Sequence, residues 1–253
     1  MILALMKNPL VNIAIQAARA AGSIIMRAAD RLDTIKVQEK APNDFVTNVD
    51  QRVEREIIDI IRKAYPNHGI QGEEGGNIKG NEYTWIIDPI DGTRNFIHGF
   101  PHYVVSIAIR YRNNIEHGVI YDPIRQELFT GSRGKGAQLN DHRIRVSTRS
   151  KLEDCLLSGA FYPETSQELF LQYGDNIRRA GAAALDLAYV ACGRLDGFWE
   201  LGLKPWDIAA GALFIKEAGG LVSDLDGSEN YLQTGNIVAG NPKVLKLLLK
   251  AMK

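Results

Sequence analysis

The chain has 253 residues, a length that allows one large domain or two smaller domains sharing a cleft. Hydrophobic residues form 45% of it and charged residues 24%, which is ordinary for a soluble globular protein. Its 30 basic and 30 acidic side chains cancel, so the composition gives no footprint of direct binding to nucleic acid or to an anionic membrane.

The cysteines and the amino-terminal segment bear on the compartment. Cys155 and Cys192 lie in apolar surroundings, which favours buried free thiols in a reducing compartment over a disulfide. In residues 1–7 the only charge follows the apolar run, the reverse of a signal peptide. No apolar stretch is expected to approach the length of a membrane span. These observations predict a cytoplasmic protein.

Two amphipathic helices are predicted first along the chain. Apolar residues recur at helical spacing over residues 9–29. Asp50 is expected to open a second helix as its N-cap, a position that leaves it able to contact a site. The apolar face of this second helix consists of Val53, Ile57, Ile60, Ile61 and Ala64.

A glycine-rich segment, Gly69–Gly76, follows the second helix and contains the adjacent carboxylates of Glu73 and Glu74. Charged residues in so flexible a segment are usually solvated. From the residues alone, a surface loop and a pair of ligands both remain open.

The segment Trp85–Phe96 carries the most informative motif. An apolar run leads into Asp88, so this carboxylate is expected at the end of a buried strand, Tyr83–Asp88. Pro89 cannot donate a ladder hydrogen bond and is expected to end that strand.

Asp91 follows three residues after Asp88 and precedes Gly92 and Thr93. Two carboxylates that converge in a buried place are costly unless a cation compensates their charge. The amides and hydroxyl of Gly92 and Thr93 are placed to bind an anion. The pattern favours a site for cations and a phosphate, although Asp-Pro and Asp-Gly pairs also form ordinary turns.

Three more strands are expected in the first half, at Tyr103–Arg112, Asn114–Tyr121 and Glu127–Gly131, with a hairpin turn at Asn113–Asn114. The basic, glycine-rich segment Gly131–Gly136 lacks the frame and ending of a phosphate loop. It is expected to be a turn whose charges could face a partner.

After about Lys151 short strands and helices alternate, which predicts an α/β class. The expected strands are Leu156–Ala160, Gly197–Glu200 and Leu221–Asp224. The expected helices are Ala182–Cys192, Trp206–Ala218 and Pro242–Met252, the last with Asn241 as N-cap. Asp207, in the first turn of the middle helix, could be no more than a favourable charge there.

The carboxylate motifs taken together resemble the inositol monophosphatase family of magnesium-dependent, lithium-sensitive phosphatases: they are Glu73–Glu74, Asp88-x-x-Asp91-Gly-Thr and Trp206–Asp207. The likeness covers nearly the whole chain, because further segments follow in the family's order: Asn43–Asp50, Gly181–Tyr189 and Asp196–Glu200. It is strongest toward bacterial inositol-1-monophosphatases, at Arg178–Gly181 and Leu232–Pro242.

The resemblance implies a layered helix–sheet–helix α/β fold, an α+β sandwich, in two halves. Residues 1–148 would form two helices and an antiparallel sheet that carry the main metal motif. Residues 149–253 would form a mixed α/β half with Asp207 and the residues that select the substrate.

The resemblance also implies two or three Mg²⁺ ions per site and inhibition by Li⁺. Glu73, Asp88 and the carbonyl of Ile90 would hold the first ion. Asp88, Asp91 and Asp207 would hold the second, with Asp88 bridging. The charge count agrees, because four carboxylates balance two divalent ions before a phosphate arrives.

The implied reaction is direct attack by a metal-activated water. Thr93 and Glu73 would orient and deprotonate it, Asp50 would support Thr93, and the amides of Gly92 and Thr93 would bind phosphate. The residues offer no convincing covalent nucleophile, since neither cysteine lies beside the motif and no histidine is tied to it by spacing.

The implied substrates are inositol-1-phosphate and related polyol phosphates. In the family, an acid at the position of Glu200 bonds the ring hydroxyls of inositol. The backbone at the position of Ala183 lines the sugar, and the residue at the position of Arg178 reaches the substrate. On sequence alone Glu200 and Arg178 could be surface residues, and Arg94 stands where relatives often have a small residue. The expected substrate contacts are Ile90, Asp91, Gly92, Thr93, Arg178, Ala183, Glu200 and Asp207.

Other functions stay open. Fructose bisphosphatases, histidinol phosphatases and nucleotide 3′-phosphatases share the metal motif. Bacterial relatives are also associated with transcription through antitermination factors, which implies a separable protein-binding role, with those factors or RNA polymerase as partners. Arg178–Arg179 or Arg133–Gly136 could carry it. A homodimer is also expected.

Overall fold

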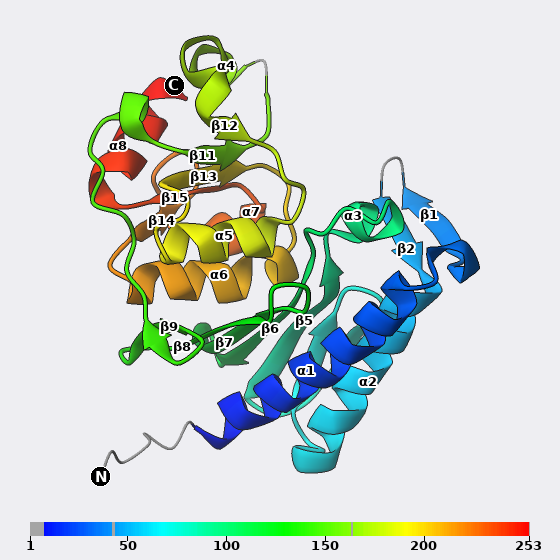
Figure 1. Cartoon of the computed structure of the whole chain (residues 1–253). Helices are drawn as coiled ribbons and strands as arrows, with labels where there is room; N and C mark the ends of the chain where they lie inside the picture. Colours follow the sequence, from blue (N-terminus) through cyan, green and yellow to red (C-terminus); the bar gives the residue numbers. More distant parts are fainter. Residues whose placement is uncertain (1–7, 42–43, 163, 253) are drawn as a thin grey trace.

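The computed structural model describes residues 8–41, 44–162 and 164–252 (Figure 1). The predictions for residues 1–7 and for Asn43 lie outside the described residues. The helices are α1 (Pro9–Ala29), α2 (Asn48–Ala64), α3 (Thr93–Ile97), α4 (Gln167–Tyr173), α5 (Ala183–Ala191), α6 (Pro205–Glu217), α7 (Tyr231–Thr234) and α8 (Pro242–Ala251). Short 3-10 helices lie at Leu32–Thr34, Leu152–Asp154 and Gly174–Asn176.

The described strands form three sheets. A two-stranded sheet consists of β1 (Val37–Ala41) and β2 (Asp44–Thr47). The large sheet has the order β10 (His142–Arg143), β9 (Gly136–Leu139), β8 (Glu127–Ser132), β7 (Asn114–Asp122), β6 (Val104–Tyr111), β5 (Tyr83–Asp91), β3 (Gly69–Gly72), β4 (Gly76–Ile78). The small sheet has the order β12 (Ile177–Arg178), β11 (Leu157–Gly159), β13 (Gly197–Glu200), β15 (Ile237–Gly240), β14 (Leu221–Ser223).

Helices and sheets alternate in layers (Figure 1). Helices α1 and α2 cover one face of the large sheet, and α6 packs on its other face. Helices α5 and α6 also contact the small sheet, whose far side is covered by α8. The predicted layered α/β fold is therefore confirmed. The large sheet is antiparallel except for the parallel pair β3–β5, and the small sheet is mixed.

Each predicted helix and strand is present, with its ends within two residues of the prediction except in β5. The hairpin between β6 and β7 turns at Arg112–Asn113, one residue earlier than predicted, with Arg112 at φ 55°. Asn241 caps α8, because its Oδ1 accepts from the amides of Lys243 and Val244. Both cysteines are free thiols as predicted, with Cys155 buried and Cys192 only half-buried.

The membrane prediction was wrong for α1. Its 21 residues are long and apolar enough for a membrane span by length and composition. Half of its most apolar 18-residue stretch is buried, and the helix packs against α2, β6 and β7. Because a buried, alanine-rich core helix can have the same length and apolar composition, these two properties are weak evidence for a membrane span.

The prediction that Asp50 is the N-cap of α2 was also wrong. Thr47 is the N-cap, and its hydroxyl accepts hydrogen bonds from the amides of Val49 and Asp50. Asp50 lies three positions into the helix and accepts from the amide of Thr47 at 2.9 Å. This reciprocal pair is a capping box with an aspartate as its acid. It turns the Asp50 carboxylate back toward the start of the helix.

Pro89 does not end β5, which continues to Asp91. Asp88 pairs with Ser106 and Asp91 with Val104, so three steps on β5 oppose two on β6. The extra residue is a β-bulge, one of the few places in a sheet where proline is tolerated. The bulge re-aims the chain between Asp88 and Asp91.

Candidate active site

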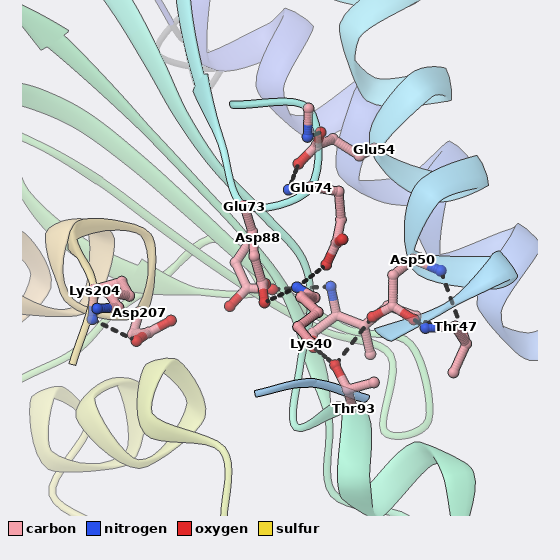
Figure 2. A network of polar contacts seen from close by, with 12 residues as sticks. Lys40, Thr47, Asp50, Glu54, Glu73, Glu74, Asp88, Thr93, Lys204 and Asp207 are labelled. Atoms are coloured by element: carbon pink, nitrogen blue, oxygen red, sulfur yellow. Dashed lines mark hydrogen bonds and ion pairs between the residues drawn. The ribbon is translucent and has the colours of Figure 1, made fainter. Parts of the chain in front are cut away.

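Three carboxylates meet where β5 ends beside the start of α6. Oxygens of Asp88, Asp91 and Asp207 all lie within 4.8 Å of one another. Asp88 and Asp91 are only 2% and 7% exposed. The amide of Ile90 donates to Asp88 Oδ1 at 3.0 Å, and the amide of Lys204 donates to Asp207 Oδ2 at 2.7 Å (Figure 2). The convergence predicted from the sequence is therefore present.

The cluster is unfavourable as a set of bare charges. Burial raises the pKa of Asp88 well above its usual range, and the neighbouring charges of Glu73, Asp91 and Asp207 raise it further. Burial and the charge of Asp207 likewise raise the pKa of Asp91. Such groups must bind protons or cations. An all-oxygen donor set of this kind suits a hard divalent cation.

Glu73 borders this cluster at the end of β3. Its amide donates to the carbonyl of Ile87 at 3.2 Å, which ties the glycine-rich segment to β5. Burial raises the pKa of Glu73 to about 7, although Lys40 acts in the opposite direction. Glu73 is therefore part of the site rather than a solvated loop residue.

Lys40, on β1, contacts the carboxylates of Glu73 and Glu74, a contact that the sequence did not predict. Its Nζ lies 3.1 Å from Glu73 Oε1 and 2.6 Å from Glu74 Oε1 (Figure 2). Burial lowers the pKa of Lys40, but the bonds and charges of Glu74 and Glu73 outweigh burial and raise it overall. A lone lysine on a short exposed strand carries no sequence signal for such a contact.

Thr93 begins α3 and lies next to Asp50. Its Oγ1 is 3.0 Å from Asp50 Oδ1 and 2.9 Å from the carbonyl oxygen of Ile90 (Figure 2). Burial raises the pKa of Asp50, while hydrogen bonds from Thr47 and Thr93 lower it. Gly92 has φ +97°, and a Cβ there would lie 2.9 Å from the carbonyl oxygen of His102, so only glycine fits.

The second half of the chain contributes through α5. The amides of Ala184 and Leu185 donate to Asp91 Oδ2 at 2.9 and 3.4 Å. The N-cap of α5, Ala182, has no side-chain oxygen, so the carboxylate of Asp91 on β5 accepts these hydrogen bonds in its place. This contact brings buried Ala183 beside the cluster.

Glu200 lies at the end of β13, close enough to Asp207 of the cluster for that charge to affect its pKa. Burial raises its pKa to about 7, and the charges of Asp186 and Asp207 add to this effect. Arg178 is exposed, and its Nη1 donates to the carbonyls of Asp175 and Ile177 at 2.8 and 3.3 Å. Arg179 is the arginine whose charge acts on Glu200.

Arg94, where relatives often have a small residue, places its guanidinium 5.2 Å from the ring centroid of Phe45. His102 is buried, with Nε2 3.5 Å from Asp186 Oδ1, and His98 is exposed.

A sequence model of the inositol monophosphatase family matches residues 6–253. The chain belongs to this family. It is 53% identical to a protein named "Nus factor SuhB" from Pseudomonas aeruginosa, covering 97% of this chain and 96% of that protein.

Solved structures agree with the family assignment. A crystal structure of the extragenic suppressor protein SuhB from Bartonella henselae matches with a TM-score of 0.92 at 42% identity, covering 97% of this chain and 99% of the other. An IMPase from Thermotoga maritima matches with a TM-score of 0.90 at 36% identity, covering 97% of each chain. Proteins of this family are generally metal-dependent, which fits the carboxylate cluster.

Proposed function

We propose that this protein is a Mg²⁺-dependent phosphomonoesterase that hydrolyses inositol-1-phosphate and related polyol phosphates to the alcohol and phosphate. The convergence of Asp88, Asp91 and Asp207 within 4.8 Å, with Glu73 beside them, carries this proposal. Family membership supports a phosphatase, and the oxygen donors support Mg²⁺ over softer metals.

Glu73, Asp88 and the Ile90 carbonyl would hold one ion, and Asp88, Asp91 and Asp207 would hold a second. Bound divalent ions supply charge neutralisation for phosphate and lower the pKa of water. Four carboxylates against two divalent ions leave the site neutral, so a phosphate dianion is not repelled.

Groups around the cluster would orient the attacking water, accept its proton and bind the phosphate. The Thr93 hydroxyl, held by Asp50, orients the attacking water, and the carboxylate of Glu73 accepts its proton. As the water oxygen bonds to phosphorus, the P–O bond to the alcohol breaks and the alcohol oxygen takes a proton from solvent. The amides of Gly92 and Thr93 bind phosphate oxygens. No histidine is needed for either step.

Substrate choice falls to residues of the second half. Glu200 hydrogen-bonds ring hydroxyls, and the backbone at Ala183 lines the sugar. Arg178 would have to leave the carbonyls of Asp175 and Ile177 to reach a substrate. Arg179 already acts on Glu200 and is the nearer candidate for this role.

A second function, protein binding in transcription antitermination, is favoured by the likeness to "Nus factor SuhB". Antitermination factors or RNA polymerase would be the partners. One candidate surface is exposed Arg178–Arg179. The other is the Arg133–Gly136 turn, whose shape is fixed because Glu217 accepts from the amides of Gly134 and Gly136, each at 2.7 Å.

The balanced charge supports a protein that binds neither an anionic membrane nor nucleic acid directly. The likeness to bacterial relatives is the basis for proposing a cytoplasmic homodimer. The sugar bisphosphatase and nucleotide 3′-phosphatase activities of the wider family are less favoured, because Glu200 suits a neutral polyol.

Phosphate release from inositol-1-phosphate at increasing Mg²⁺ tests the enzyme function. Asp88→Asn should lower the rate by about 10²–10³-fold, the usual effect of one lost electrostatic stabiliser, and stay folded. Asp59→Asn, an exposed change on α2, is the control. Absence of Mg²⁺-dependent release by the natural chain would overturn the proposal. Partner capture by Asp88→Asn and by Arg133→Ala would show whether binding is separable from catalysis.

A further inference from the structure

Glu54 is a buried carboxylate that the proposed reaction does not use. It lies on α2, one helical turn after Asp50, and is 2% exposed. Its two oxygens face backbone amides: Oε2 accepts from Glu74 N at 2.9 Å, and Oε1 accepts from Gly75 N at 2.5 Å (Figure 2). Hydrogen bonds from amides to a carboxylate are charge-assisted and stronger than neutral ones.

The glycines of the segment make room for this carboxylate. A Cβ on Gly72 would lie 2.6 Å from Glu54 Oε2, and a Cβ on Gly75 would lie 2.7 Å from Oε1. Neither glycine has a positive φ, so the absence of a side chain, rather than backbone freedom, is what the position requires. Gly72 and Gly75 directly flank Glu73 and Glu74.

The segment is therefore held from two sides. Glu54 holds the amides of Glu74 and Gly75 from α2, and the carbonyl of Ile87 holds the amide of Glu73 from β5. Ile87 directly precedes Asp88, so the second bond fixes Glu73 relative to that carboxylate. A glycine-rich chain without these bonds would have many orientations.

We propose that Glu54 is a positioning residue that holds Glu73 in place for a divalent cation shared with Asp88. The inference rests on the proposed function, in which Glu73 is a metal ligand. Groups that orient a metal ligand typically change metal affinity by about 10–100-fold when they are replaced.

Glu54→Gln is the informative substitution. Its carboxamide has one oxygen and one NH₂ group, so it can accept from only one of the two amides and places a donor against the other. We expect Mn²⁺, used as a probe, to bind about tenfold more weakly by electron paramagnetic resonance of the full chain. The Mg²⁺ concentration for half-maximal rate should rise more than the rate at saturating Mg²⁺ falls.

Two controls separate the possible outcomes. Asp59→Asn, exposed on the same helix, should bind Mn²⁺ as the natural chain does. Asp88→Asn should lose the tight Mn²⁺ site. If Glu54→Gln matches the natural chain while Asp88→Asn loses Mn²⁺, the positioning role is wrong. If the natural chain and Asp88→Asn bind Mn²⁺ equally, the proposed metal site itself is wrong.

Gly75→Ala tests the same role if Glu54→Gln does not fold. Gly75 is exposed, and its new Cβ would displace the Glu54 carboxylate without opening the core. Gly174→Ala is the matched control, since a Cβ there meets nothing within 4 Å. Weaker Mn²⁺ binding by Gly75→Ala alone supports the proposal, and equal binding by both variants overturns it.

Discussion

The carboxylate of Asp91 accepts a hydrogen bond from the amide of Ala184 at 2.9 Å, across 93 residues of chain. One residue therefore serves two structures: it belongs to the carboxylate cluster at the end of β5, and it caps α5. A charge that is costly to bury is partly compensated by helix amides, because the start of a helix favours negative charge.

Asp91→Asn and Asp91→Ala should separate these two roles. Asparagine keeps an oxygen that can accept from the amide of Ala184, whereas alanine leaves α5 without a side-chain cap. Both should lose phosphatase activity. Urea unfolding in EDTA should find the alanine variant less stable than the asparagine variant by about 0.5–2 kcal/mol, the usual contribution of a cap. Equal unfolding free energies would show that the cap contributes nothing.

The raised carboxylate pKa values predict how stability depends on pH without metal. Burial raises the pKa of Glu73 and of Glu200 from 4.5 to about 7. The folded chain then binds more protons than the unfolded chain between these values, so its stability should decrease as pH rises from about 4.5 to above about 7.

Melting temperatures in EDTA across this pH range measure that effect. The decrease should be smaller for Glu200→Gln, because glutamine at position 200 cannot titrate. It should be smaller still when Mg²⁺ replaces EDTA, because the cation would neutralise Glu73. A melting temperature that rises with pH equally in both chains would contradict the raised values. The comparison of the two chains removes the contribution of all other carboxylates.

Lys40 should compete with the cation for Glu73. Its ammonium lies 3.1 Å from Glu73 Oε1, which a bound ion would also require. Lys40→Gln should therefore lower the Mg²⁺ concentration needed for half-maximal rate and lower the melting temperature in EDTA, because Glu73 and Glu74 lose their counter-charge. Exposed Lys36→Gln is the control. A higher Mg²⁺ requirement in Lys40→Gln would mean that the lysine assists the site.

The sequence predicts those parts of the fold that have a regular apolar period. The helix over residues 9–29 and the strand Gly197–Glu200 match the structure residue for residue. The short, glycine-containing strands β3 and β4 have no such period. They form through pairing, β3 with β5 and β4 with β3, which the sequence does not show. The bulge at Pro89 depends on β6 in the same way, and the sequence alone favours a strand end.

The site is predictable where acidic motifs are spaced and is hidden where contacts come from distant segments. Asp88 and Asp91 meet as their spacing predicts, whereas only the family resemblance placed Asp207 with them. Glu54 did have a signal, because it is a charged residue on the apolar face of an amphipathic helix, one turn after Asp50. Lys40 had none, since only the folding of β1 onto the site brings it near Glu74.

The family resemblance implies that lithium inhibits hydrolysis uncompetitively. Under the proposed function, an ion held by Asp91 and Asp207, with Asp88 shared, would leave with the product and would be bound more weakly than the first. Li⁺ in the vacated position would fit among the carboxylates yet supply half the charge of Mg²⁺, trapping phosphate without supporting turnover. Inhibition should therefore deepen as substrate rises and weaken in Asp207→Asn. Steady-state rates over a grid of substrate and lithium concentrations test this, with sodium as the control for ionic strength. Simple competition between lithium and substrate would show that the order of release is wrong, because the cation would then bind before the substrate rather than after it.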